Sequence, residues 1–394
     1  MLNYPFTFPK TRARLVKRVN RFVVEVDIEG RREKAYLANP GRLWELFLPG
    51  TELVLTPARD TGKLPYTVLA CYKDDLPVLL HTHLTNRIIR YLIEKSFLLP
   101  YENYRVKKAE PAYRRHRFDL LLEHCRSGEE YYLEIKSCTL FNGRLAMFPD
   151  AVTTRGANHL YRLKELSDTG VQTGCLFVVM NPRISYFLPA YHIDPDFARA
   201  SLAVKDDVQL KAVAVGFDKN FTEIESAGEI PIPFNFLSGE LADRGVYMLL
   251  IKIYQAITLP IGSLGEICFN EGYYVYAGSA RSGLSKRINR HMRKNKVQRW
   301  HIDYLTAEAS KIIPVPVITA ENLECQMAGR LQEIADRTVT GFGSSDCRCP
   351  GHLFYFAENP LTLDHFIDLI QDYRLRIPAE KLARLFALQQ DINI

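Results

Sequence analysis

The sequence contains no unbroken apolar stretch close to the ~20 residues that a helix needs to cross a membrane. Its N-terminal segment, MLNYPFTFPK, also lacks the basic part and the following apolar part of a secretion signal. The chain has no internal repeat and no low-complexity tract. We therefore expect a cytoplasmic protein without a membrane partner.

A disulfide framework is not expected either. The eight cysteines are scattered, and several stand in apolar runs such as GCLFVVM, where a reduced buried thiol is the commoner state. Cys347, Cys349 and His352 form the pattern C-x-C-x-x-H, and Cys325 and His291 are conceivable neighbours in space. Zinc sites more often have two to four residues between their cysteines, so the pattern favours turn residues and leaves a metal here open.

The length and the charge distribution indicate several domains and a polyanionic partner. A chain of 394 residues is too long for one hydrophobic core, and 47% hydrophobic with 24% charged residues is typical of a soluble globular protein. The net charge is only +6, but residues 10–21 and 281–299 are rich in Lys and Arg without any acid, and a shorter basic cluster lies within 107–117. One such run is usually a solvated face, whereas three runs beside candidate catalytic segments favour nucleic acid, whose phosphates release counterions when neutralised.

The pattern of short segments divides the chain into an α/β multidomain protein. Residues 1–84 contain several short alternating segments, such as RFVVEVDI, with a turn at Asn39-Pro40-Gly41-Arg42, and they predict a small β-barrel. Basic and aromatic residues of this barrel, Arg12, Arg14, Arg18 and Phe22, are expected to grip a nucleic-acid strand without sequence preference.

Residues 85–228 predict a mixed α/β domain. NRIIRYLIEKSF has helical spacing with Thr85 as the expected N-cap, and TTRGANHLYRLKELSD predicts a helix that begins at Thr153 or Thr154. The strand CLFVVMN follows it. Residues 229–241, with their prolines and glycines, are expected to be a linker, 242–358 a further α/β domain, and 359–394 a helical tail.

The segment 118–136 predicts a metal-binding hairpin. Residues two apart in a strand share a face, so Glu134 and Lys136 project together, and the preceding strand brings Asp119 beside Glu134. Two carboxylates suit Mg²⁺, and a neighbouring lysine can orient or deprotonate a water and offset charge during phosphodiester hydrolysis. The alternative for Glu134 and Lys136 is a surface salt bridge on an edge strand.

Four motifs together resemble the SfsA (sugar fermentation stimulation protein A) family over roughly residues 1–228. They are NPGRL (39–43), RFDLLLE (117–123), YLEIKSCTL (132–140) and FPDAVTTRGANHLYRL (148–163). The resemblance implies an OB-like N-terminal barrel, a PD-(D/E)xK nuclease-like domain and DNA binding. It would make Asp119, Glu134 and Lys136 the catalytic triad, with the two carboxylates as metal ligands.

The same resemblance places further candidates around this triad. Arg155, His159 and Arg162 lie on one face of the expected helix, where they can meet phosphate, with His159 as a packing residue in the alternative interpretation. Asp150 is a further candidate metal or water partner. Arg42, in the NPGRL motif, joins the expected DNA-binding residues.

A second constellation lies within 245–356. Gly245-Val246-Tyr247 opens one expected strand and Tyr276-Ala277-Gly278 closes another; a basic helix with Arg287, Arg290 and His291 follows, and Glu324 stands on a separate helix. With WHIDYL (300–305) and GFGSSDCRCPGHLFYF (341–356), the arrangement resembles a diverged, Uri-type GIY-YIG nuclease. The resemblance implies Tyr247 and Tyr276 as the motif tyrosines, Arg287 as phosphate ligand and Glu324 as metal ligand; Arg290 and His291 are expected to contact DNA. Two tyrosines that merely pack a sheet edge are the alternative.

The sequence thus predicts a DNA-binding protein with Mg²⁺-dependent endonuclease activity at one or both centres, with Mn²⁺ as a substitute ion. The alternative is a non-catalytic DNA-binding regulator of sugar metabolism that uses nuclease-like folds as binding surfaces. This alternative does not explain why two carboxylates, Asp119 and Glu134, would face a polyanion. An RNA substrate is a third interpretation, separable with matched DNA and RNA.

Overall fold

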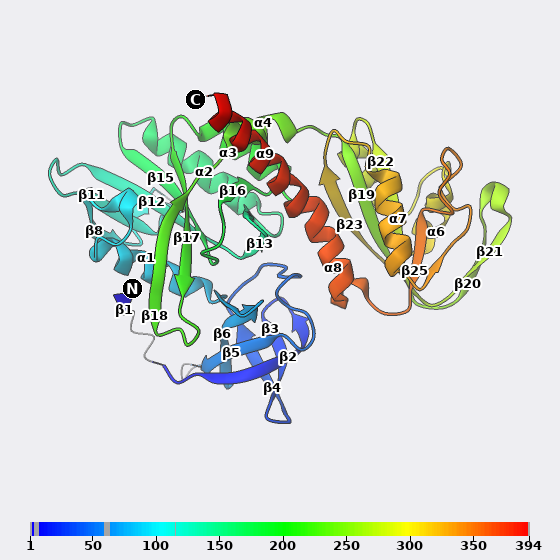
Figure 1. The fold of residues 1–394 in the computed structure, drawn as a ribbon, viewed down its shortest axis with the longest axis horizontal. Coiled ribbons are helices and arrows are strands. Elements are labelled where there is room, and N and C mark those ends of the chain that lie inside the picture. Colours follow the sequence, from blue (N-terminus) through cyan, green and yellow to red (C-terminus); the bar gives the residue numbers. More distant parts are fainter. Residues whose placement is uncertain (1, 4–7, 59–63, 115, 393–394) are drawn as a thin grey trace. The chain divides into compact units, whose positions relative to one another are not determined.

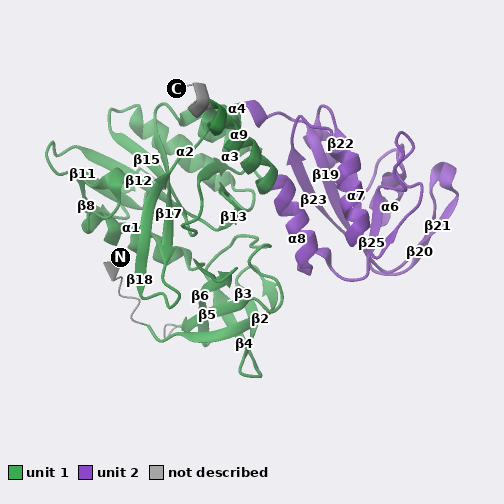
Figure 2. Cartoon of the chain, viewed as in Figure 1, with its two compact units in different colours: residues 1–238, 375–394 green, residues 239–374 purple. Residues whose placement is uncertain are grey.

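The computed structural model describes residues 2–3, 8–58, 64–114 and 116–392 (Figure 1). The chain forms two compact units (Figure 2). Unit 1 comprises Met1–Ser238 and Leu375–Ile394, and unit 2 comprises Gly239–Arg374. Within the described residues, no helix has the length and apolar character needed to span a membrane.

The first part of unit 1 is the predicted barrel. Five strands close on themselves, because β4 pairs with β3 on one side and, in parallel, with β6 on the other. The predicted alternation is confirmed in β3, where Val24, Val26 and Ile28 are buried and the intervening residues are not. The strands of this sheet are β2 (Thr11–Asn20), β3 (Val23–Ile28), β4 (Arg31–Leu37), β5 (Glu52–Pro57), β6 (Tyr66–Lys73) and β7 (Leu76–Leu79).

A mixed sheet of seven strands forms the rest of unit 1, in the order β1-β18-β17-β15-β12-β11-β8. Strands β12, β15 and β17 are parallel to one another, and β8, β11 and β12 form an antiparallel meander. The strands are β1 (Leu2–Asn3), β8 (Tyr104–Ala109), β11 (Leu120–His124), β12 (Glu130–Cys138), β15 (Gln172–Val179), β17 (Gln209–Phe217) and β18 (Glu223–Ile230).

Helices and two small sheets complete unit 1. The helices are α1 (Thr82–Glu94), α2 (Thr154–Ser167), α3 (Pro195–Val204) and α9 (Ile377–Ile392), with the 3₁₀ turn η1 (Leu99–Tyr101). The small sheets are β9 (Ala112–Tyr113) with β10 (His116–Arg117), and β13 (Leu140–Asn142) with β14 (Leu145–Phe148) and β16 (Tyr186–Pro189). Thr153 caps α2 by accepting a hydrogen bond from the Gly156 amide at 3.0 Å, which confirms the predicted start of this helix.

Unit 2 is built on a five-stranded sheet in the order β23-β19-β22-β25-β24. The strands are β19 (Gly245–Ile253), β22 (Gly272–Ala280), β23 (Lys311–Ile318), β24 (Arg337–Thr338) and β25 (Leu353–Phe356). The helices are α5 (Leu284–Met292), α6 (His301–Glu308), α7 (Glu324–Ile334) and α8 (Asp364–Gln371), with the 3₁₀ turns η2 (Gly262–Leu264) and η3 (Pro360–Thr362).

Two expectations about local structure need correction. Helix α1 begins at Thr82, and Thr85 is buried within it, so Thr85 packs in the core and is not the N-cap. The expected linker contains the end of β18 and helix α4 (Phe234–Glu240). Between β19 and β22 the chain forms a hairpin of β20 (Ile257–Pro260) and β21 (Glu266–Phe269).

The expected helical tail contains two helices that belong to different units. Its first helix, α8, belongs to unit 2 and α9 to unit 1, with the π-helical turn η4 (Asp372–Arg376) between them. In unit 1 the rings of Tyr186 and Phe386 stack with their centroids 5.0 Å apart, which gives α9 an aromatic anchor on the small sheet.

Candidate functional site

The hairpin of β11 and β12 brings two carboxylates together in unit 1. Leu120 is paired with Leu133, so the next position on each strand holds Asp119 and Glu134. The backbone amide of Ile135 donates to Oδ2 of Asp119 at 2.6 Å, and Asn86 of α1 donates to its Oδ1 at 2.7 Å. Hydrogen bonds from β12 and from α1 thus hold the Asp119 carboxylate in place.

Glu134 is buried, with 4% of its surface exposed, and its two oxygens differ. Oε1 accepts from Lys136 Nζ at 2.5 Å and faces His159 Nδ1 at the same distance. Arg155 Nε donates to His159 Nε2 at 3.2 Å, which assigns the ring proton to Nδ1 and makes it a donor to Glu134. Oε2 is buried without a hydrogen-bond partner among the described residues.

The pKa values of the two carboxyl groups are shifted in opposite directions. Burial and the nearby Glu134 raise the pKa of Asp119 to about 6. Burial opposes ionisation of Glu134 as well, but the hydrogen bond from His159 and the charge of Lys136 outweigh it and lower its pKa. The pKa of Lys136 is raised because the attraction of Glu134 exceeds the effect of burial, so this amine is an ammonium at neutral pH.

The carboxylates open into a cavity of about 420 Å³ in unit 1. Its lining comes from the barrel loop, α1, β12, the loop before α2, and α2 itself, and it includes Asn39, Asn86, Asp150, Arg155 and His159. Arg155 is exposed, whereas His159 is only partly so. A pocket lined by two acids and by basic residues can hold a cation and a phosphate together.

Asp150 lines this cavity, but its carboxylate also contacts the barrel loop. Its Oδ2 accepts from the backbone amide of Leu43 at 3.3 Å. A Cβ on Gly41 would lie 2.1 Å from the same oxygen, so any other residue there would have to displace the Asp150 carboxylate. Asp150 therefore fastens the NPGRL loop of the barrel to the mixed α/β domain.

The predicted DNA-binding arginines of the barrel fall into different environments. Arg18 donates to the backbone carbonyls of Gly41 and Arg42 at 2.6 and 2.7 Å, so its guanidinium holds the turn together and is not presented to a ligand. Arg42 lies over the Trp44 ring at 4.9 Å. Arg12 pairs with Glu52 but remains exposed, and Arg14 is exposed as well.

The helix α2 contributes unevenly. Arg155 and His159 both line the cavity and contact each other, so these two share the helix face that the spacing predicted. Arg162 instead pairs with Glu165 at 2.6 Å on the same helix. Asn86 was missed by sequence reasoning, because it is one polar residue beside the buried positions Thr85 and Ile88 and nothing local indicates that it meets Asp119.

Unit 2 brings together both predicted tyrosines. Tyr247 on β19 and Tyr276 on β22 have ring centroids 6.3 Å apart. Gly278 makes this approach possible, since a Cβ there would lie 2.6 Å from Tyr247 Cζ and 2.9 Å from Tyr276 Cε1. Burial raises the pKa of both phenols, so both hydroxyls are protonated at neutral pH.

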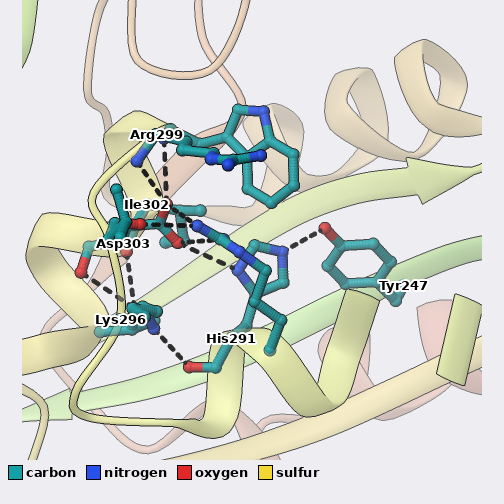
Figure 3. A network of polar contacts seen from close by, with 10 residues as sticks. Tyr247, His291, Lys296, Arg299, Ile302 and Asp303 are labelled. Atoms are coloured by element: carbon teal, nitrogen blue, oxygen red, sulfur yellow. Dashed lines mark hydrogen bonds and ion pairs between the residues drawn. The ribbon is translucent and has the colours of Figure 1, made fainter. Parts of the chain in front are cut away.

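A buried polar network extends from Tyr247 (Figure 3). Its hydroxyl lies 2.8 Å from His291 Nε2, and the other ring nitrogen of His291 is 3.6 Å from Asp303 Oδ1. Arg290 donates to both oxygens of Asp303 at 2.8 and 2.9 Å. His291 is 1% exposed, so the expected DNA contact by His291 is corrected: it is a buried partner of Tyr247, while Arg290 neutralises Asp303.

Arg287 and Glu324 are linked through one residue. Arg287 donates to the carbonyl oxygen of Ser279 at 2.6 Å, and the Ser279 hydroxyl donates to Glu324 Oε2. Glu324 Oε1 lies 3.2 Å from His352 Nδ1. Burial opposes ionisation of Glu324, but the hydrogen bonds from His352 and Ser279 prevail and lower its pKa.

Three family models match the chain. The SfsA N-terminal OB domain matches residues 16–80, the sugar fermentation stimulation protein RE domain matches residues 83–221, and the Domain of unknown function DUF123 matches residues 246–375. The first two coincide with the barrel and the mixed sheet of unit 1, and the third with the unit that carries the GIY-YIG-like motifs.

Similar proteins support the same division. A sugar fermentation stimulation protein homolog of Pyrobaculum neutrophilum is 38% identical over 210 residues, which cover 53% of this chain and 88% of the relative. A homolog of Clostridium tetani is 31% identical over 216 residues, 54% of this chain and 94% of the relative. The structure of Pyrococcus furiosus SfsA in complex with Ca²⁺ is 32% identical, has a TM-score of 0.54, and covers 59% of this chain and 99% of its own.

The barrel and the mixed α/β domain are the two parts of the chain that the SfsA models match, so unit 1 has the OB-plus-RE domain architecture of that family. The chain belongs to the SfsA family and carries a Uri/GIY-YIG-like DUF123 domain after the SfsA part.

Proposed function

We propose that the carboxylate cavity of unit 1 is a divalent-cation centre that hydrolyses phosphodiester bonds in DNA. The observation that carries the proposal is the buried Oε2 of Glu134, which has no hydrogen-bond partner among the described residues and lies beside Asp119. An orphan carboxylate oxygen in the interior costs free energy unless a ligand compensates it. Two acids facing a polyanion would also repel phosphate, and a cation between them reverses that effect.

The donor set suits a hard cation. Carboxylate oxygens are the ligands that Mg²⁺ prefers, and both Asp119 and Glu134 are fixed before any ion arrives. The Pyrococcus furiosus relative is described in complex with Ca²⁺, which prefers oxygen ligands as well. When bound, Mg²⁺ or Mn²⁺ would supply Lewis-acid polarisation of the phosphate and a more acidic water.

The surrounding side chains have distinct roles in this proposal. Lys136, an ammonium at neutral pH, supplies positive charge to the phosphate as negative charge develops on its oxygens and is not itself the base. His159 orients Glu134 through its Nδ1 proton. Arg155, exposed at the cavity, is placed to take a phosphate oxygen of the DNA backbone.

A second centre in unit 2 is supported by one specific observation, the link from Arg287 through Ser279 to Glu324. This link supports Arg287 as the phosphate ligand and Glu324 as the metal ligand, because both side chains are close enough to shift the pKa of Tyr276. Because the phenols are protonated at neutral pH, Tyr247 would act as a base only by passing its proton to His291, whose pKa is lowered by burial.

The test is cleavage of single-stranded, duplex and branched DNA, and of matched RNA, with Mg²⁺ or Mn²⁺. Glu134→Gln and Lys136→Ala are expected to reduce cleavage at the first centre by about 100-fold or more, and Arg287→Ala reports separately on the second. Glu129→Gln, an exposed acid in the turn of the same hairpin, is the matched control and should cleave normally.

DNA binding separates the enzyme from the regulator. Asp119→Ala and Glu134→Ala variants are expected to lose the Mg²⁺ dependence of DNA binding. If both variants bind DNA as the wild type does, and no substrate is cut with either ion, the hydrolytic function is wrong and the non-catalytic regulator stands. Preferential cleavage of RNA would change the substrate but not the site.

A further inference from the structure

Four potential metal ligands converge in unit 2, outside the residues assigned above. Cys325, Cys347, Cys349 and His352 each place one ligand atom so that all four atoms lie within 4.8 Å of one another. Cys325 is in the first turn of α7, and the other three residues lie in the segment between β24 and β25. The distance from Cys347 Sγ to His352 Nε2 is 3.4 Å.

The cluster is close to the size of a tetrahedral metal shell. With Zn–S bonds of about 2.3 Å and Zn–N bonds of about 2.0–2.1 Å, the ligand atoms of a zinc tetrahedron are separated by roughly 3.5–3.8 Å. The observed pair at 3.4 Å is within about 0.1 Å of that separation, and pairs as far apart as 4.8 Å would close by side-chain adjustments of about 1 Å. Three thiolates and one imidazole are soft ligands that select zinc over the oxygen-loving cations proposed for unit 1.

We propose that Cys325, Cys347, Cys349 and His352 bind one Zn²⁺ ion with a structural role. Four protein ligands complete the tetrahedron and leave no open position for a substrate, as in structural zinc sites of the Cys₃His type. The three thiols lose their protons on binding, and His352 binds as the neutral imidazole through Nε2.

The second layer of the site is also present. His352 is buried, and its other ring nitrogen lies 3.2 Å from Glu324 Oε1. A ligating histidine commonly donates its remaining N–H to a carboxylate, which fixes the tautomer and the ring orientation. Nδ1–H pointing at Glu324 leaves Nε2, the nitrogen facing Cys347, free for the metal.

A zinc ion at this position would stabilise an irregular segment of unit 2. The segment from Thr340 to Gly351 consists of turns and bends, and Gly341 and Gly343 adopt positive φ of 73° and 71° within it. A metal would cross-link this irregular segment to α7. Because Glu324 accepts hydrogen bonds from both His352 and Ser279, the ion would also hold Glu324 in place.

Sequence reasoning left this metal open because C-x-C is an uncommon zinc spacing. The fourth ligand comes from a helix 22 residues before Cys347, and only the fold brings it near. The proposal stands independently of hydrolysis in unit 1, since none of these ligands belongs to that cavity.

The experiment uses the full chain purified under reducing conditions and stripped with a chelator. Zn²⁺ is titrated against a chromophoric competitor, and Co²⁺ serves as a spectroscopic probe, since thiolate-to-cobalt charge transfer reports sulfur ligation. Glu134→Gln is the background for both titrations, so that the carboxylate cavity of unit 1 does not contribute. One equivalent of Zn²⁺ per chain is expected, with a thiolate band for Co²⁺ and release of protons on binding.

Variants make the assignment specific. Cys325→Ser and Cys349→Ser are expected to weaken Zn²⁺ binding by more than about 100-fold, since a lost ligand costs more than a lost outer partner. Cys268→Ser, which removes an exposed thiol of the same unit outside the cluster, is the matched control and should bind normally. Cys349→His keeps four ligands and should retain zinc with an altered Co²⁺ spectrum, which separates loss of the ligand from loss of the fold.

Two results would overturn the proposal. One is the absence of saturable Zn²⁺ binding by the reduced protein. This includes the case in which two of the thiols are found as a disulfide and the protein still binds no metal once that disulfide has been reduced. The other is equal zinc affinity in the wild type, Cys325→Ser and Cys349→Ser.

Discussion

Replacing Asp303 by asparagine tests the buried network of unit 2. The side chain of Asp303 is fully buried, and it accepts two hydrogen bonds from Arg290 and two from the backbone amides of Arg299 and Trp300, at 2.9 and 3.0 Å. Asparagine has nearly the same shape but no charge. Its amide N–H donors would also face the N–H donors of Arg290 or of the two backbone amides. The substitution therefore removes one partner of a buried ion pair and leaves the other.

The expected cost follows from the partner's environment. Breaking a buried ion pair by removing one charge costs about 3–5 kcal/mol. Arg290 is 24% exposed at its side chain, so water compensates part of its charge. We therefore expect Asp303→Asn to lower the free energy of unfolding of unit 2 by about 3 kcal/mol, the low end of that range.

The measurement is urea unfolding at pH 7 followed by tryptophan fluorescence. The chain has two tryptophans, Trp44 in unit 1 and Trp300 in the network itself, so a Trp44→Phe background assigns the signal to unit 2. Glu308→Gln, which removes an exposed negative charge from the same helix, is the control and should change stability by less than about 0.5 kcal/mol. A loss below about 1 kcal/mol for Asp303→Asn would refute the reasoning.

The pH dependence gives a second check on the same variant. Burial opposes ionisation of Asp303, but His291, Arg290 and the backbone amides hold its pKa well below the ordinary value. A group with a depressed folded pKa stabilises the fold above its unfolded pKa, about 3.9, and the stabilisation is lost as the pH falls below that value. The difference between wild type and Asp303→Asn should therefore shrink as the pH falls from about 4 to 2.

Three further predictions concern other sites. Burial raises the pKa of Glu45 to about 7 from 4.5, so the folded state keeps a proton that the unfolded state releases, and the free energy of unfolding should fall by roughly 3 kcal/mol as the pH rises from about 4.5 to 7. In urea unfolding, Glu45→Gln should therefore be more stable than the wild type at pH 8 and equally stable at pH 4. A stability difference that does not change with pH would contradict this. Because the pKa of Asp119 is about 6, a cation must displace its proton at lower pH, so calorimetric Mn²⁺ affinity should fall about tenfold per pH unit below 6 in wild type but not in Asp119→Asn; an affinity independent of pH would argue against Asp119 as a ligand. Gly278→Ala places a methyl group 2.6 Å from the Tyr247 ring and should destabilise unit 2 by about 1–3 kcal/mol in thermal unfolding, whereas an unchanged midpoint would show that the rings can move apart.

Local patterns predicted the elements that the site depends on. Alternation in RFVVEVDI predicted a half-buried strand, and two-residue periodicity in LEIKS placed Glu134 and Lys136 on one face of β12. The capping threonine predicted the start of α2, and helical spacing predicted that Arg155 and His159 lie together. These features depend on neighbours within a few residues, which a sequence displays directly.

What the sequence did not predict depends on contacts between distant segments. Arg18 was expected at the DNA surface, but its guanidinium donates hydrogen bonds to backbone carbonyl oxygens of a turn that lies 21 to 24 residues further along the chain. His291 was expected to contact DNA, but Asp303 and the strand bearing Tyr247 enclose it. In each case a charged or polar residue satisfies a backbone or a buried group that local periodicity does not reveal.

The central claim is that Asp119 and Glu134 hold a divalent cation, and the most direct test is the anomalous diffraction of crystals soaked in Mn²⁺. The account predicts a peak between the two carboxylates, within the roughly 2.0–2.6 Å of Glu134 Oε2 at which oxygen ligands bind Mg²⁺ and Ca²⁺. The peak should disappear in crystals of Glu134→Gln. No peak in the wild-type cavity at saturating Mn²⁺, or an undiminished peak in the variant, would contradict the claim.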